Sequence, residues 1–165
     1  MKRSIILNNT EIQHKIKRIA FQVYENNSNQ KEVIIAGIAN NGFLLAKKLK
    51  TALEKISSIK VTICEVKIDK KNPLNPIETS IATTDYKNKS LVLVDDVLNS
   101  GTTLMYAVRH FLAVPLKQFN TAVLVNRNHK KYPVKADFKG ISLSTSLQEH
   151  ITVEVASNKI IAYLN

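Results

Sequence analysis

The sequence predicts an α/β fold in which a mostly parallel central sheet is flanked by helices. The first observation is that several short segments consist almost entirely of apolar, often β-branched residues, as expected of strands buried on both faces. The second is that segments with apolar residues at helical spacing lie between them, so strands and helices alternate along the chain. The main predicted strands are residues 31–38, 60–68, 90–96 and 121–127.

The helices are predicted from apolar residues that recur three or four positions apart. Thr10 is the predicted N-cap of the first helix, which ends at the polar segment 26–30. Two further helices are expected after Gly42 and after Thr103, and both have a continuous apolar face. The remaining expectations are a mobile, proline-containing segment at 69–89, short strands within 134–143 and 150–155, and a small C-terminal hood.

Length and composition favour a single domain over residues 1–165. The chain has 165 residues, of which 44% are apolar, enough for one full core. No apolar run approaches a membrane span, and the run within MKRSIILNN is too short for a signal peptide. The one cysteine, Cys64, cannot form an internal disulfide and lies in an apolar strand. We therefore expect a cytoplasmic protein without a membrane partner, with Cys64 in its core.

The charge balance points to anionic partners. The chain carries 24 Lys plus Arg and 13 Asp plus Glu, a net charge of +11. Such a surface attracts nucleic acid or phosphate-rich metabolites. A lysine-rich surface that only keeps the protein in solution is an equally good interpretation. Composition alone does not decide between them.

The predicted topology brings four loops to one edge of the sheet. In parallel α/β sheets, ligands bind beyond the carboxyl ends of the strands. The segments that follow the predicted strands should therefore surround one crevice. These segments are residues 37–42, 66–71, 95–103 and 126–131.

The segment LVLVDDVLNSGTTLM, residues 91–105, carries the strongest chemical signal. The small polar residues Asn99, Ser100, Gly101, Thr102 and Thr103 lead into a helix, whose free N–H groups and dipole favour a phosphate. This segment has neither the residue spacing nor the lysine of a Walker A loop.

Two carboxylates precede this loop, Asp95 and Asp96, and they cannot bind phosphate themselves. Vicinal ribose hydroxyls, alone or with Mg²⁺, satisfy both of them. Capping of a turn, with Thr102 as N-cap, is the alternative interpretation, but two carboxylates exceed what capping needs. The segment therefore predicts a site for a ribose that bears a phosphate.

The motif VLVDDVLNSGTT resembles the phosphoribosyl-diphosphate motif of type I phosphoribosyltransferases. One branch, the bifunctional pyrimidine operon regulators and uracil phosphoribosyltransferases, reads V-D-D-V-L-Y-T-G-R-T here. That branch also has A-V-L-V-D-R-G-H-R-E-L-P-I-R-A-D-F-V-G, which is similar to AVLVNRNHKKYPVKADFKG at residues 122–140. The opening helix and the segment VIIAGIANNGFLLAKKL follow the same family, so the resemblance covers nearly the whole chain. It implies the type I phosphoribosyltransferase fold.

The resemblance also implies roles for individual residues. Asp95 and Asp96 would hold the ribose hydroxyls and, indirectly, the cofactor Mg²⁺, while Asn99–Thr103 would bind the 5′-phosphate. Lys70 and Lys71 lie in the loop that closes over the reaction, and they would be catalytic together with the two aspartates. The loop that grips pyrophosphate would be Ala39, Asn40, Asn41 and Gly42. The hood over the base would include Val125, Asn126, Arg127, His129 and Lys130.

Several positions depart from the family pattern. The family's T-R-G pyrophosphate loop is Asn40-Asn41-Gly42 here, and the arginine of its phosphate loop is Thr102. Lys70 and Lys71 stand near the place of a tyrosine-arginine pair. Because arginine offers pyrophosphate a planar, bidentate donor and lysine does not, we expect slow transfer. Purine enzymes of the class have an aspartate as general base where this chain has Asn99, which disfavours a purine substrate.

Two functions remain open at this point. One is a phosphoribosyltransferase acting on phosphoribosyl diphosphate and a nucleobase, with uracil favoured, that forms a nucleoside monophosphate. The other is a nucleotide-sensing regulator of pyrimidine genes on the same scaffold, with RNA as a candidate partner. His129 fits a ligand contact and a surface position equally well. The family also suggests a homodimer or a larger assembly.

Overall fold

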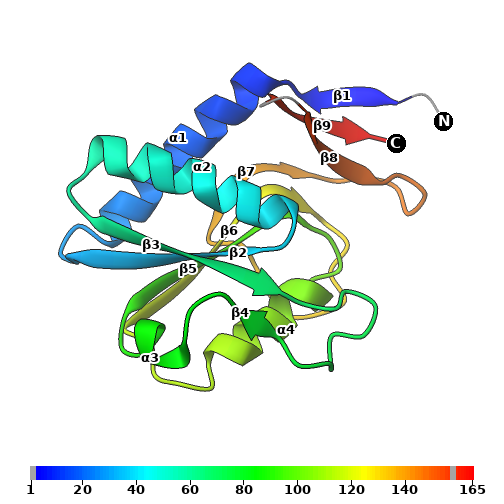
Figure 1. The fold of residues 1–165 in the computed structure, drawn as a ribbon. Coiled ribbons are helices and arrows are strands. Elements are labelled where there is room, and N and C mark those ends of the chain that lie inside the picture. The colour runs from blue at the N-terminus through cyan, green and yellow to red at the C-terminus, as the bar shows by residue number, and fades with distance from the viewer. Residues whose placement is uncertain (1–2, 157–158) are drawn as a thin grey trace.

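A six-stranded sheet forms the middle layer of the computed structural model, which describes residues 3–156 and 159–165 (Figure 1). The strand order is β4-β3-β2-β5-β6-β7, and all neighbours are parallel except β3 and β4. This is the mostly parallel sheet that the alternating pattern predicts. The strands are β2 Glu32–Ile38, β3 Lys60–Lys67, β4 Glu78–Thr79, β5 Ser90–Leu98, β6 Gln118–Arg127 and β7 Phe138–Leu143.

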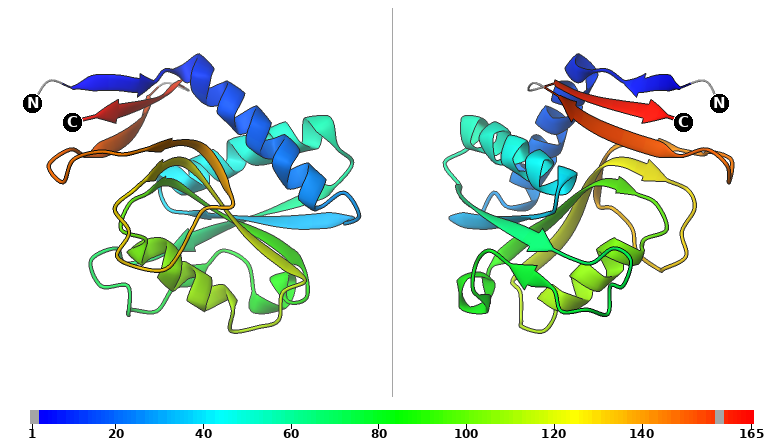
Figure 2. Two further views of the ribbon diagram at one scale, coloured as in Figure 1. Left: turned by 180° about the vertical axis from the view of Figure 1, so that it is seen from behind. Right: turned by 45° about the vertical axis from the view of Figure 1, so that its right-hand side comes forward.

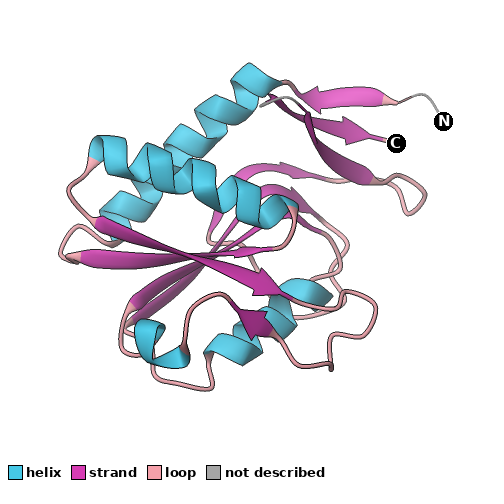
Figure 3. Cartoon of the chain, in the orientation of Figure 1, coloured by secondary structure: helices cyan, strands magenta, loops and turns pink. Residues whose placement is uncertain are grey.

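Helices cover both faces of this sheet (Figure 3). Helices α1 (Asn9–Asn26) and α2 (Asn41–Ile56) pack on one face, and α3 (Thr83–Tyr86) and α4 (Thr102–Phe111) on the other. Side chains of β2 alternate between the two cores, because successive residues of a strand point to opposite faces. Ile35 joins the core under α1 and α2, and Ile34 joins the core under α3 and α4. None of the described helices has the length and apolar character needed to span a membrane.

A smaller antiparallel sheet lies beside the main one and contains the first and last strands that the structure describes (Figure 2). Its strand order is β1-β9-β8, with β1 Ser4–Leu7, β8 Ile151–Ala156 and β9 Lys159–Leu164. The predicted hood is therefore present but is completed by the N-terminal strand, which was not predicted. Pairing of β1 with β9 joins residues more than 150 positions apart, and no local pattern signals it.

Several predicted element boundaries are wrong. Helix α1 is capped by Asn8, not Thr10, because the Asn8 side chain accepts from the Glu11 N–H (3.0 Å) and Glu11 accepts from the Asn8 N–H (2.8 Å). Strand β5 continues to Leu98, beyond its predicted end at Asp96. The segment 69–89, in which no strand or helix was predicted, contains β4 and α3.

Candidate phosphate and ribose site

The acidic pair lies near the carboxyl end of β5, the third strand from one edge of the sheet. Asp95 is 5% exposed and Asp96 is half-buried. Each carboxylate accepts the backbone N–H of the following residue: Asp95 Oδ1 from Asp96 and Asp96 Oδ1 from Val97, both at 2.9 Å. These bonds fix both carboxylates at the same end of the sheet.

Burial makes Asp95 hard to ionise. Burial, and then the neighbouring Asp96 carboxylate, raise the pKa of Asp95 to about 8, although the Lys70 ammonium acts in the opposite direction. In the ligand-free protein, Asp95 therefore holds a proton at neutral pH. A ligand that brings hydroxyl donors or a cation to this pair would stabilise the ionised form.

The loop after the acidic pair is held ready for an anion at the start of α4. The Ser100 and Thr102 hydroxyls are 2.9 Å apart, and Ser100 Oγ accepts the Thr102 N–H at 3.3 Å. Gly101 has φ +87°, and a Cβ there would lie 2.6 Å from Cγ1 of Val134. Glycine is therefore required here for both conformation and space. Beyond this turn, the first N–H groups of α4 have no partner within the helix.

Two neighbouring cavities meet at Asp96. The first, about 350 Å³, contains the loop 99–103 and both aspartates, and residues 151–153 of β8 also line it. The second, about 430 Å³, is lined by residues 39–41, Lys67, Ile68, Lys70 and Asp96. Asn41, Lys70 and Asp96 line both cavities. The arrangement offers one polar compartment on each side of a shared wall.

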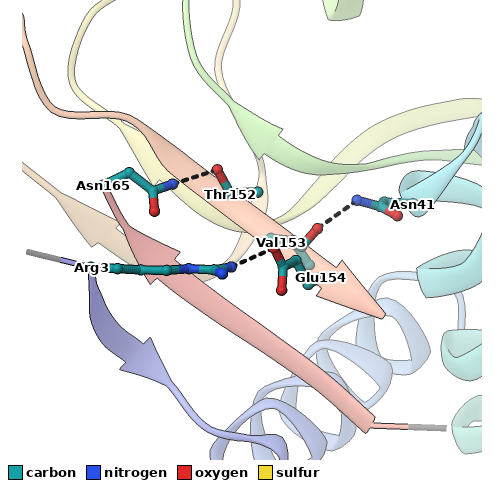
Figure 4. A network of polar contacts seen from close by, with 6 residues as sticks. All are labelled: Arg3, Asn41, Thr152, Val153, Glu154 and Asn165. Carbon is teal, nitrogen blue, oxygen red and sulfur yellow. Dashed lines mark hydrogen bonds and ion pairs between the residues drawn. The ribbon is translucent and has the colours of Figure 1, made fainter. Parts of the chain in front are cut away.

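Asn41 connects Asp96 to the small sheet, and Figure 4 shows its bond to Val153 of β8. Its Nδ2 donates to Asp96 Oδ2 and to the Val153 carbonyl of β8, both at 2.9 Å. Strand β8 is held in turn by an ion pair between Arg3 and Glu154 and by a bond from Asn165 Nδ2 to Thr152 Oγ1 (2.7 Å). Asn41 is therefore already engaged at the position where the predicted pyrophosphate loop lacks its arginine.

Comparison with known proteins identifies the family. The model of the phosphoribosyl transferase domain matches residues 2–158. This chain belongs to the phosphoribosyltransferase family. It is 31% identical over 160 residues to a protein of Streptococcus agalactiae named bifunctional protein PyrR, with 94% of this chain and 91% of that protein covered. The protein of that name from Bacillus pumilus is 32% identical over 176 residues, with 98% of this chain and 97% of that protein covered.

Solved phosphoribosyltransferase structures share the fold. The hypoxanthine phosphoribosyltransferase of Trypanosoma cruzi superposes with a TM-score of 0.78 at 14% identity, covering 96% of this chain and 95% of that one. A hypoxanthine-guanine phosphoribosyltransferase of Bacillus anthracis superposes with a TM-score of 0.73 at 20% identity, covering 98% of this chain and 99% of that one. The α/β architecture with its small antiparallel sheet is thus that of a type I phosphoribosyltransferase.

Most of the predicted site residues lie around the two cavities. Asp95, Asp96 and the whole loop Asn99–Thr103 line the first, and Ala39, Asn40 and Asn41 line the second. The peptide bond between Ala39 and Asn40 is cis. Gly42 lines neither cavity. It is buried, and a Cβ there would lie 2.8 Å from the Val94 carbonyl, so it allows α2 to approach β5 closely.

The structure separates the two predicted catalytic lysines. Lys70 lines both cavities and acts on the charge of Asp95, whereas Lys71 lines neither. The backbone N–H of Lys71 instead donates to Asp69 Oδ1 (2.9 Å) in a turn. Sequence alone offers no reason to prefer one of two adjacent lysines in a loop.

The predicted base-binding segment of this phosphoribosyltransferase lies outside both cavities. Val125 is fully buried in the core under α1 and α2, and Arg127 is 4% exposed. Lys130 Nζ donates to Asn126 Oδ1 and to the Arg127 carbonyl, both at 2.7 Å. His129 Nε2 lies 2.6 Å from the Thr145 carbonyl. These side chains hold the loops together in the ligand-free protein.

The cavity wall formed by β8 was not predicted as part of the site. Ile151, Thr152 and Val153 line the first cavity together with the loop 99–103. Their sequence is that of an ordinary strand, with no motif to mark a ligand contact. Only the packing of the small sheet against the main one brings them there.

Proposed function

We propose that the protein transfers the 5-phosphoribosyl group from phosphoribosyl diphosphate to a nucleobase, with uracil favoured, and releases pyrophosphate. The observation that carries this proposal is the wall shared by the two cavities. A phosphoribosyl group would occupy the first cavity and pyrophosphate the second. The bond between them would then cross the wall at Asp96, Asn41 and Lys70.

Each part of the donor has a suitable partner. The 5′-phosphate would accept from the free N–H groups at the start of α4 and from the hydroxyls of Ser100 and Thr102. The ribose hydroxyls would donate to the carboxylates of Asp95 and Asp96. The pyrophosphate would lie against the Ala39–Asn41 backbone and Lys70.

The reaction needs charge stabilisation on the departing group. A nitrogen lone pair of the base forms the new bond to C1 of the ribose, while the C1–O bond breaks and its electron pair leaves with pyrophosphate. The proton of the attacking N–H passes to water. Lys70 is positioned to stabilise the negative charge that grows on the leaving oxygen.

The residues present fit a magnesium ion that arrives with the substrate. Among the described residues there is no cluster of three or more His, Cys, Asp or Glu that would bind a metal alone. Two adjacent carboxylates and a phosphate-binding loop match the preference of Mg²⁺ for substrate phosphates, water and few carboxylates. Asp95 and Asp96 would hold the ion through water, and its charge would offset that of pyrophosphate.

Slow transfer is part of the proposal. Among the residues that the structure describes, no arginine lines the second cavity, and the cationic side chains that do are Lys67 and Lys70. A lysine is a point charge without the planar fork that matches pyrophosphate. Asn41 donates to Asp96 and Val153 and supplies no charge. Cytoplasmic location and a homodimer or larger assembly complete the proposal and follow the sequence expectations.

Ligand-induced stabilisation tests where the nucleotide binds. Phosphoribosyl diphosphate or uridine monophosphate at a hundred times its dissociation constant should add about 2.7 kcal/mol of stability. That corresponds to a rise in Tm of roughly 5–11 °C for a chain of this size. Asp96→Asn should reduce both shifts, whereas Glu54→Gln, which removes an exposed carboxylate on α2, should leave them unchanged. An undiminished shift in Asp96→Asn would refute the ribose assignment.

A basic groove between α1 and α2 favours RNA binding as a second function. This groove has a volume of about 650 Å³, and its lining includes Lys17, Lys47, Lys48 and Lys55. Arg127 is buried and does not add its charge to such a face. If the groove neutralises RNA phosphates, affinity should fall steeply with salt, and the double variant Lys17→Ala/Lys55→Ala should reduce the logarithmic slope by about 2. Binding that ignores salt, or none at low salt, would reject this function.

A further inference from the structure

Asn99 is held in one orientation by a buried arginine. Arg127 is 4% exposed, and its Nη1 donates to Asn99 Oδ1 at 2.9 Å. The same guanidinium donates through Nε to Thr145 Oγ1 (2.6 Å) and through Nη2 to the Ser146 carbonyl (2.8 Å). Three bonds from one rigid, planar group leave it little freedom to move.

This contact determines which end of the Asn99 amide faces the ligand. A guanidinium can only donate hydrogen bonds, so the atom that faces it must be the oxygen of Asn99. The opposite end of the amide, Nδ2, is then turned away from Arg127. Asn99 lines the first cavity and is exposed, and among the described residues no hydrogen bond uses its Nδ2. The free group presented by Asn99 is therefore an N–H donor.

The sheet order places this donor on the side from which a base would attack. The second cavity lies at the ends of β2 and β3, whereas Arg127 ends β6, on the other side of β5. A nucleophile that displaces pyrophosphate approaches C1 opposite the leaving group. With pyrophosphate toward β2 and β3, the base would lie toward β6, beside Asn99.

We propose that Asn99, oriented by Arg127, determines base specificity by donating Nδ2–H to a carbonyl oxygen of a pyrimidine base. This inference rests on the proposed function and names its substrate class. A pyrimidine-2,4-dione attacking through N1 carries the O2 carbonyl beside the reacting nitrogen and meets the donor. A purine attacking through one imidazole nitrogen carries its proton on the other, and that N–H would oppose the Asn99 amide.

Calorimetry with two ligands separates the base contact from the ribose phosphate contacts. Uridine monophosphate contains the carbonyl, and ribose 5-phosphate lacks the base. Asn99→Ala removes the donor without adding charge. It should raise the dissociation constant of uridine monophosphate by roughly 5- to 10-fold, since one hydrogen bond is lost. The dissociation constant of ribose 5-phosphate should change by less than about 2-fold. Asn99→Asp keeps the bond to Arg127 but turns an acceptor toward the base, and should widen the gap further.

Arg127 is a positioning residue in this account, and its variants test that role. Arg127→Lys loses the fork that fixes the amide. It should lower the ratio of the affinity for uridine monophosphate to the affinity for ribose 5-phosphate by several-fold. Thr145→Val removes one acceptor of Arg127 and leaves Asn99 bonded, so it should leave the ratio near that of the wild type. A merely structural role would weaken both ligands together.

The outcomes distinguish this inference from the proposed function. Failure of the wild type to bind either ligand would overturn both. Binding of both ligands with a ratio unchanged in Asn99→Ala and Asn99→Asp would overturn the role of Asn99 and leave the phosphoribosyl site intact.

Discussion

Replacing Asp95 by asparagine is expected to make the ligand-free protein more stable, although the replaced residue lies at the centre of the site. The pKa of Asp95 is raised from the usual 3.8 to about 8, first by burial and then by Asp96. Near neutral pH the unfolded state ionises freely, whereas the folded state must keep a proton or bury a charge. Asparagine avoids this cost and keeps the oxygen that accepts the Asp96 N–H. We expect a gain of about 2–4 kcal/mol at pH 7.

The gain should depend on pH in a defined direction. Between pH 4 and pH 8 the folded state binds more protons at Asp95 than the unfolded state, so wild-type stability from this group falls as pH rises. The difference in the free energy of unfolding between Asp95→Asn and the wild type should therefore grow from pH 4 to pH 8 and level off above pH 8. Urea denaturation with a chelator present, at several pH values, measures it. A constant difference across this range would contradict the account.

Lys70→Ala is expected to lower turnover by about 10²–10³-fold, the typical effect of removing one preorganised donor. Lys70 lines both cavities and reduces the pKa of Asp95. In the proposed reaction its charge would face the departing pyrophosphate, so the loss should fall on kcat more than on binding of uridine monophosphate. Pyrophosphate release under saturating phosphoribosyl diphosphate and Mg²⁺ is the measurement.

Lys71→Ala provides a matched control for this result. It removes the same charge one residue along the chain, from a side chain outside both cavities. We expect a change of less than about 3-fold, in the range of a screened surface charge. Equal losses in both variants would show that the loop contributes only general positive charge.

That Asp95, Asp96 and the loop 99–103 would lie together was predictable because the information is local. Asp95, Asp96 and the loop Asn99–Thr103 follow one another within nine positions, and the end of a buried strand places them together. The parallel sheet was predictable for a similar reason, since its strands are continuous apolar segments. Local patterns fix which residues can meet a ligand at this end of the sheet.

The parts that sequence reasoning missed depend on long-range contacts. The first cavity is closed by β8, whose position depends on pairing between the two ends of the chain. Arg127 was predicted to contact ligand, but its guanidinium bonds to Asn99, Thr145 and Ser146. Asn41 was read as a lost arginine, but it bonds to Asp96 and to β8. Composition and residue spacing do not predict these hydrogen-bond partners.

The most direct test of the central proposal is product formation from phosphoribosyl diphosphate, Mg²⁺ and a panel of nucleobases. We predict that uracil yields uridine monophosphate and pyrophosphate in equal amounts. The rate should be about 10²–10³ below that of a family member with the arginines of the pyrophosphate and closing loops. Hypoxanthine and guanine should give less, and Asp96→Asn should abolish the reaction. The absence of a nucleotide product with every base, at enzyme concentrations near those of the substrates, would contradict transferase activity.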